Sequence, residues 1–274
     1  MRRLPAFVPF ALALGCALSA GGCYFTRSPS RPLPALLFSH PASAPEAPST
    51  GGAAAHPPCL VIFIPGFLDG PDTYREHGFP SALVRSGAAC DSVAVDLHFR
   101  YYGEGGAADI LYEDVLAPAV GRGYEEIWLV GISMGGLGTM MLARAHPELI
   151  DGVVLLSPFL GEESFVREVA AAGGLAAWHP PSPMPAREDT STYSTFLWAW
   201  FRGYVEDPDS MPPTWIGWAN GERLAPVAQL FAAALPESHT LARDGAHNWA
   251  TWRPLFADLL QRAQPGRGRA ARAR

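Results

Sequence analysis

The feature that most constrains the fold of this sequence is an apolar run that ends in Gly-x-Ser-x-Gly. Residues 127–130 are apolar, and residues 131–135 read Gly-Ile-Ser-Met-Gly. Apolar residues at helical spacing follow from Leu137. The pattern predicts a strand, a sharp turn and a helix, with Ser133 at the turn. Two glycines suit such a turn because side chains there would collide, and the first N–H groups of the helix would face the serine.

Composition excludes several classes of protein. The 274 residues carry 49% hydrophobic and 17% charged side chains, which is typical of a globular protein of one large domain. The formal net charge of −6 argues against a nucleic-acid partner. The chain has no lysine, which excludes Ser–Lys catalysis and Schiff bases. It also has no C-x-x-C or H-E-x-x-H pattern, so we expect no metal site.

Residues 1–23 resemble an export signal, because a pair of arginines precedes an apolar stretch too short for a comfortable membrane span. The small residues before Cys23 resemble the lipobox of bacterial lipoproteins, in which that cysteine carries lipid. Ala20 stands where leucine is usual, and Cys16 is a weaker second candidate. An ordinary secretory signal cut near Ala20 is the alternative. Either interpretation predicts export: a lipid anchor in the cell envelope, on the periplasmic or outer-membrane face, or else secretion.

The rest of the chain divides by composition. Residues 24–58 are rich in Pro, Ser and Ala, which predicts a flexible linker. Residues 59–264 alternate buried strands with helices, which predicts a mostly parallel sheet with helices on both faces. Residues 158–212 interrupt this rhythm with many aromatic residues, and we expect a helical cap insertion there. Most of its aromatics should pack the cap onto the body, and some could line a substrate cleft. The arginine, glycine and alanine composition of residues 265–274 predicts a disordered basic tail.

The expected elements can be given by range. The predicted strands are 60–64, 91–96, 127–132, 152–156, 214–218 and 238–242. The predicted helices are 72–86, 107–121, 137–145, 225–235 and 254–264, and Pro118 is expected to shorten the second.

Residues 59–264 resemble the α/β-hydrolase superfamily, in which the catalytic residues follow the chain order Ser, acid, His. The resemblance implies an α/β-hydrolase fold and a triad of Ser133, Glu222 and His247. His247 would be the base, and Glu222 would orient its ring. The backbone N–H groups of Phe67 and Met134 would form the oxyanion hole.

Alternatives remain for the catalytic acid and base. Asn220 could occupy the apex of the loop given to Glu222, and Glu162 follows a strand where some members of the superfamily place the acid. His179 and His239 also follow the nucleophile, but His247 is favoured because it follows the last strand in a Gly-containing loop. His98 and Tyr101 are expected near the cleft as pocket walls.

The superfamily's sheet order also implies a disulfide. Cys59 and Cys90 each precede a strand, and the two strands are neighbours in that order. Both cysteines would therefore lie at the amino edge of the sheet, close enough for a disulfide. Export would permit its oxidation.

These features predict an exported serine hydrolase that cleaves a carboxylic ester or thioester through an acyl-enzyme, without a cofactor. Its partners would be a small-molecule ester, partly apolar, and a membrane to which the N-terminal lipid would attach the protein. A peptidase or acyltransferase on the same triad is the first alternative, because the sequence does not reveal leaving-group or acceptor pockets. A non-catalytic surface lipoprotein that uses the fold for binding is the second.

Overall fold

The computed structural model describes residues 27–41, 56–103 and 106–268. The predicted export signal and Cys23 therefore lie outside the described residues. Within these ranges, no helix is both long and apolar enough to cross a membrane.

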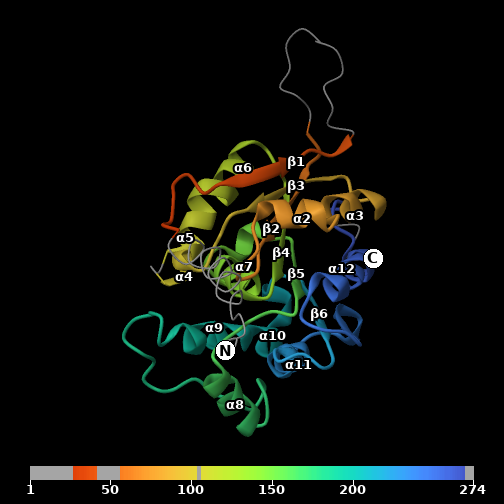
Figure 1. The fold of residues 1–274 in the computed structure, drawn as a ribbon. Helices are drawn as coiled ribbons and strands as arrows, with labels where there is room; N and C mark the ends of the chain where they lie inside the picture. The colour runs from red at the N-terminus through yellow and green to blue at the C-terminus, as the bar shows by residue number, and fades with distance from the viewer. Residues whose placement is uncertain (1–26, 42–55, 104–105, 269–274) are drawn as a thin grey trace, which may run out of the picture.

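A seven-stranded sheet organises the described residues (Figure 1), in the order β1-β3-β2-β4-β5-β6-β7. The first strand is antiparallel to its neighbour β3, and all other pairs are parallel. The strands are β1 (Ala35–Phe38), β2 (Cys59–Ile64), β3 (Cys90–Val95), β4 (Glu126–Ile132), β5 (Gly152–Leu156), β6 (Thr214–Ala219) and β7 (Thr240–Arg243). Strands β2 to β6 are buried along their whole length, and burial on both faces explains why β2, β4 and β5 read as largely apolar runs.

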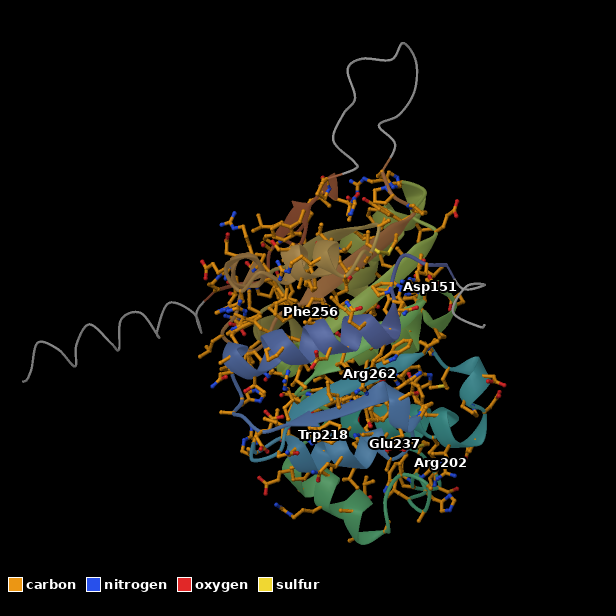
Figure 2. The ribbon with its side chains drawn as sticks, turned by 90° about the vertical axis from the view of Figure 1, so that its right-hand side faces the viewer. Asp151, Arg202, Trp218, Glu237, Phe256 and Arg262 are labelled. Carbon is orange, nitrogen blue, oxygen red and sulfur yellow. A yellow bond between two sulfur atoms is a disulfide. The ribbon has the colours of Figure 1, made fainter. Side chains whose placement is uncertain are left out.

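Helices cover both faces of the sheet, as predicted. Side chains of α2 (Pro71–Glu76), α3 (Phe79–Arg85) and α12 (Trp249–Ala263) share one apolar cluster on the first face. Figure 2 views this face, with Phe256 of α12 labelled. The second face packs against α5 (Ala107–Leu111), α6 (Ala117–Gly121), α7 (Met134–Ala145) and α11 (Ala225–Ala232). The shorter elements are α4 (Arg100–Gly103), η2 (Tyr112–Leu116), η3 (Pro147–Leu149), η4 (Pro208–Ser210) and η5 (Glu237–His239).

Three helices differ from their predicted form. The segment 72–86 is two helices, because Gly78 adopts a left-handed conformation with φ 72° between α2 and α3. The segment 107–121 does not end at Pro118, because a π-helical turn, η2, joins α5 to α6 and closes its bonds ahead of that proline. The last helix starts at Trp249, where the Asn248 side chain caps it by accepting from the backbone N–H of Thr251 at 3.2 Å.

The prediction of a flexible linker over 24–58 is wrong for residues 27–41, which pack on the body. Strand β1 pairs with β3 along its length. Both oxygens of Asp114 accept from this segment, from the Arg31 guanidinium at 2.7 Å and from the Leu33 N–H at 2.8 Å. The composition hid these contacts because β1 is a short, half-exposed edge strand and its partners lie far away in sequence.

The predicted disordered tail is also wrong at its start. Glu126 is buried at the amino end of β4, and its Oε1 accepts from the Trp128 indole at 2.7 Å. The same carboxylate accepts from the N–H groups of Gly266 at 3.0 Å and Gly268 at 2.9 Å. Residues 265–268 are therefore fixed to the amino edge of the sheet.

We expect Glu126→Gln to lower the free energy of unfolding by about 1–3 kcal/mol, because one buried acceptor oxygen becomes an NH2 group facing N–H donors. Denaturant unfolding of the full chain would measure the loss. Glu125→Gln is the matched control, because Glu125 is the preceding residue in the sequence and its side chain is exposed. Equal stability of the two variants would contradict the assigned role of Glu126.

The segment 158–212 lies between β5 and β6, and its regular elements are all helical. It contains α8 (Glu163–Ala171), α9 (Tyr193–Phe201) and α10 (Gly203–Glu206). Its aromatic residues Trp178, Trp198, Phe201 and Tyr204 are buried in the apolar cluster of the second face. The Arg202 guanidinium, labelled in Figure 2, donates to the carbonyl of Trp178 and fastens α9 to the preceding loop. These aromatics pack the segment onto the body, as predicted for most of them.

A disulfide joins Cys59 to Cys90, as predicted, with their Cα atoms 4.5 Å apart. The two residues are direct register partners at the first positions of β2 and β3. The bond therefore lies at the amino edge of the sheet.

Candidate active site

Ser133 lies at the sharp turn between β4 and α7, with φ 52° and ψ −121°. This backbone strain is rare for a residue other than glycine and is typical of a nucleophile elbow. The flanking glycines are required by space. A Cβ on Gly131 would lie 2.3 Å from the Thr139 hydroxyl, and a Cβ on Gly135 would lie 2.1 Å from the carbonyl oxygen of Ile64. The Gly-x-Ser-x-Gly pattern thus has the mechanical origin inferred from the sequence.

Two hydrogen bonds link Ser133, His247 and Glu222 in a chain. The Nε2 atom of His247 is 2.9 Å from the Ser133 hydroxyl, and its Nδ1 atom is 2.7 Å from Oε2 of Glu222. The other carboxylate oxygen of Glu222 accepts from the Ala219 N–H at 3.2 Å. The Glu222 side chain is 0% exposed. A buried carboxylate fixed by two donors is well placed to orient an imidazole ring.

The competing residues have other partners. Glu162 accepts from the Tyr193 hydroxyl at 3.1 Å, at the base of the cap segment. The Asn220 amide donates to Asp244 at 2.9 Å. His239 lies directly before β7, and its ring stacks on that of Trp215 in β6. Its Nδ1 is 3.1 Å from the carbonyl oxygen of Thr214. Burial lowers the pKa of His239.

The loop of His247 is held by the first turn of α12. The Thr251 hydroxyl accepts from the Ala246 N–H at 3.0 Å. The Trp252 ring stands perpendicular to the His247 ring, with centroids 4.9 Å apart. Its indole donates to the buried Ser157 hydroxyl at 2.9 Å, and Ser157 itself has φ 47°. The imidazole is therefore supported by packing as well as by Glu222.

The two predicted oxyanion donors flank the serine. Met134 is the first residue of α7, directly after Ser133. Phe67 follows Gly66, where an added Cβ would lie 3.5 Å from the Ser133 Cβ. The loop turns back at Asp69, whose N–H donates to the Gly66 carbonyl at 3.3 Å.

Asp69 also ties the Phe67 loop to the histidine loop. Its carboxylate accepts from the Trp249 indole at 3.2 Å, and burial raises its pKa. Sequence reasoning missed Asp69, Trp249, Trp252 and Ser157 as supporting residues. The only available signal was the position of the two tryptophans two and five residues after His247.

His98 and Tyr101 are buried beneath the N-terminal segment, in contrast to their expected place along the cleft. The Tyr101 hydroxyl accepts from the Ser30 N–H at 2.9 Å, and burial lowers the pKa of His98. The neighbouring Tyr102 reaches the elbow instead, since its hydroxyl donates to the Met134 carbonyl at 3.3 Å. In the described part of the chain, no cluster of three or more His, Cys, Asp or Glu residues could hold a metal ion.

The mostly parallel sheet with its elbow serine defines a protein of the α/β-hydrolase class. Residues 120–263, more than half of the chain, match the Esterase family, described as "Putative esterase". The chain therefore belongs to this family and is a hydrolase that acts on ester bonds. No curated protein matches the sequence.

Solved structures share the fold at low sequence identity. Fluorophosphonate-binding serine hydrolase F of Staphylococcus aureus, with substrate bound, is 13% identical, covers 84% of this chain and 98% of that one, and has a TM-score of 0.54. Est1E of Butyrivibrio proteoclasticus, with ferulic acid bound, is 16% identical, with coverages of 84% and 92% and a TM-score of 0.52. A monoacylglycerol lipase of Paleococcus ferrophilus is 16% identical, with coverages of 84% and 99% and a TM-score of 0.50. These likenesses support the fold.

Proposed function

We propose that this chain is a serine hydrolase that cleaves a carboxylic ester or thioester through an acyl-enzyme on Ser133. The observation that carries the proposal is the hydrogen-bonded chain from Ser133 through His247 to buried Glu222. A strained elbow presents the serine, and the Trp252 ring packs at a right angle to the imidazole.

The proposed reaction follows from this geometry. His247 takes the hydroxyl proton as Ser133 attacks the carbonyl carbon, and then gives that proton to the leaving group. Glu222 holds the Nδ1 proton and stabilises the imidazolium. The N–H groups of Phe67 and Met134 stabilise the oxyanion, and one such donor is typically worth about 3–4 kcal/mol. Water then hydrolyses the acyl-enzyme by the same steps.

The proposal includes export and a lipid anchor at Cys23. The Cys59–Cys90 disulfide supports an oxidising compartment, outside the cytoplasm. The three similar structures bear names that refer to different ligands, so they favour no particular acyl group.

A fluorophosphonate probe tests the nucleophile. We expect it to label the intact chain at Ser133, because His247 activates that hydroxyl, and to leave Ser133→Ala unlabelled. Mass spectrometry of the adduct locates the modified residue. Heat-unfolded wild type is the control for non-specific reaction. Absent labelling, or identical labelling of Ser133→Ala, would remove the support for the acyl-enzyme mechanism.

A further inference from the structure

Arg27, the first residue that the structure describes, lies at the edge of the sheet formed by the carboxyl ends of its strands. The active site lies at the same edge. Arg27 forms an ion pair with Asp96, which directly follows β3 at its carboxyl end. Ser30 is held nearby by the Tyr101 hydroxyl. Ser133 follows β4 at the same edge, because β3, β2 and β4 are parallel. The polypeptide therefore joins the body on the active-site side, opposite the disulfide.

This attachment shortens the link to the proposed lipid anchor. Cys23 is four residues before Arg27. A fully extended residue spans at most about 3.6 Å, so the anchor lies within roughly 14 Å of Arg27. The linker expected from composition would have let the body stand far from a membrane in any orientation. With residues 27–41 packed on the body, a lipid on Cys23 holds the active-site edge close to the bilayer.

An apolar surface lies at this edge. Leu68 is 65% exposed, and Phe67 and Phe99 are 36% and 37% exposed, with their rings 5.6 Å apart. These residues follow the carboxyl ends of β2 and β3. The other exposed large apolar residues of the described chain come from four separate elements: Leu37, Val84, Val120 and Val205. Exposed apolar side chains grouped on adjacent loops indicate an interaction surface.

We propose that Phe67, Leu68 and Phe99 dock on the lipid bilayer, so that Ser133 faces the membrane and the substrate is an amphiphilic ester held in it. The substrate part of this inference rests on the proposed function, and the docking part rests on lipid attachment at Cys23. The net charge of −6 suits contact through apolar side chains better than attraction to anionic lipid.

Linker length gives the first test. The full lipid-bearing chain is placed in phosphatidylcholine vesicles that contain a long-chain ester, and a water-soluble acetate ester is assayed in parallel. Insertion of a flexible Gly-Ser segment of about 30 residues between Phe25 and Thr26 should slow hydrolysis of the vesicle ester by about tenfold, because the effective concentration falls with linker length. Hydrolysis of the soluble ester should not change. Equal vesicle rates with and without the insertion would overturn the docking.

A charge placed on the surface gives the second test. Leu68→Glu should slow the vesicle reaction and leave the soluble ester unaffected, because a carboxylate resists entry into lipid. Val120→Glu is the matched control: Val120 is 42% exposed, on α6 near the opposite edge of the sheet. Similar vesicle rates for the two variants would contradict the proposal.

A readout that needs no catalysis separates the two proposals. A fluorophore on Leu68→Cys should be quenched by nitroxide-labelled phosphatidylcholine, and one on Val120→Cys should not. Quenching at position 68 in a chain whose Ser133 resists fluorophosphonate would retain the docking and reject the hydrolase. Labelled Ser133 and active soluble-ester hydrolysis, with no quenching at position 68, would reject the docking alone.

Discussion

Glu222→Gln is expected to lower kcat/KM by about 10⁴-fold while the fold remains intact. Both oxygens of Glu222 are acceptors, one from the Ala219 N–H and the other from Nδ1 of His247. A glutamine has one acceptor oxygen, so either orientation of its amide sets an NH2 group against one of these donors. The imidazole then rotates or adopts the wrong tautomer, and Ser133 loses the base that we propose for it.

Glu162→Gln is the control for this prediction. Glu162 contacts the Tyr193 hydroxyl in the cap segment, so its variant should keep nearly wild-type activity. The measurement is kcat/KM of both variants on one activated ester, with thermal melts to verify folding. An active Glu222→Gln beside a crippled Glu162→Gln would move the catalytic acid to the loop after β5.

The inner strands and the turn at Ser133 could be predicted because their signals are local. Strands β2, β4 and β5 are buried on both faces, so each reads as a continuous apolar run. Ser133 is marked by two glycines that the turn requires. Glu222 and His247 were placed by their order along the chain, which the superfamily resemblance supplied, and their side chains do meet Ser133 through the two hydrogen bonds described above.

The features that escaped prediction depend on contacts between distant residues. Nothing near Asp69 indicates that its carboxylate meets Trp249, which is 180 residues away. Strand β1 is four residues long and half exposed, so a Pro-rich composition concealed it. Leu33, just before this strand, is held by Asp114, which lies 81 residues later in the chain. The position of residues 265–268 likewise depends on the carboxylate of Glu126. A charged residue at the start of a strand gives no indication that its side chain is buried.

Reduction of the Cys59–Cys90 disulfide is expected to lower the free energy of unfolding by about 3–4 kcal/mol. The bond closes a loop of 31 residues in the unfolded chain, and the chain-entropy account of such a loop predicts that amount. Both cysteines are buried, so a reductant should act only as the protein unfolds. Denaturant unfolding with and without reductant therefore measures the effect, with the slope of the transition as a check on two-state behaviour.

The variant with both cysteines replaced by alanine distinguishes the effect of losing the disulfide from any other effect of the reductant. Its unfolding midpoint should be low and should not respond to reductant, whereas the wild type should fall toward it when reduced. Activity at low temperature should survive in both forms, because the disulfide lies at the amino edge of β2 and β3 and Ser133 lies at the carboxyl edge. An unchanged wild-type midpoint under reductant, with thiols shown to be free, would mean that the bond adds no stability. A loss of activity that precedes unfolding would mean instead that the amino edge influences the active site.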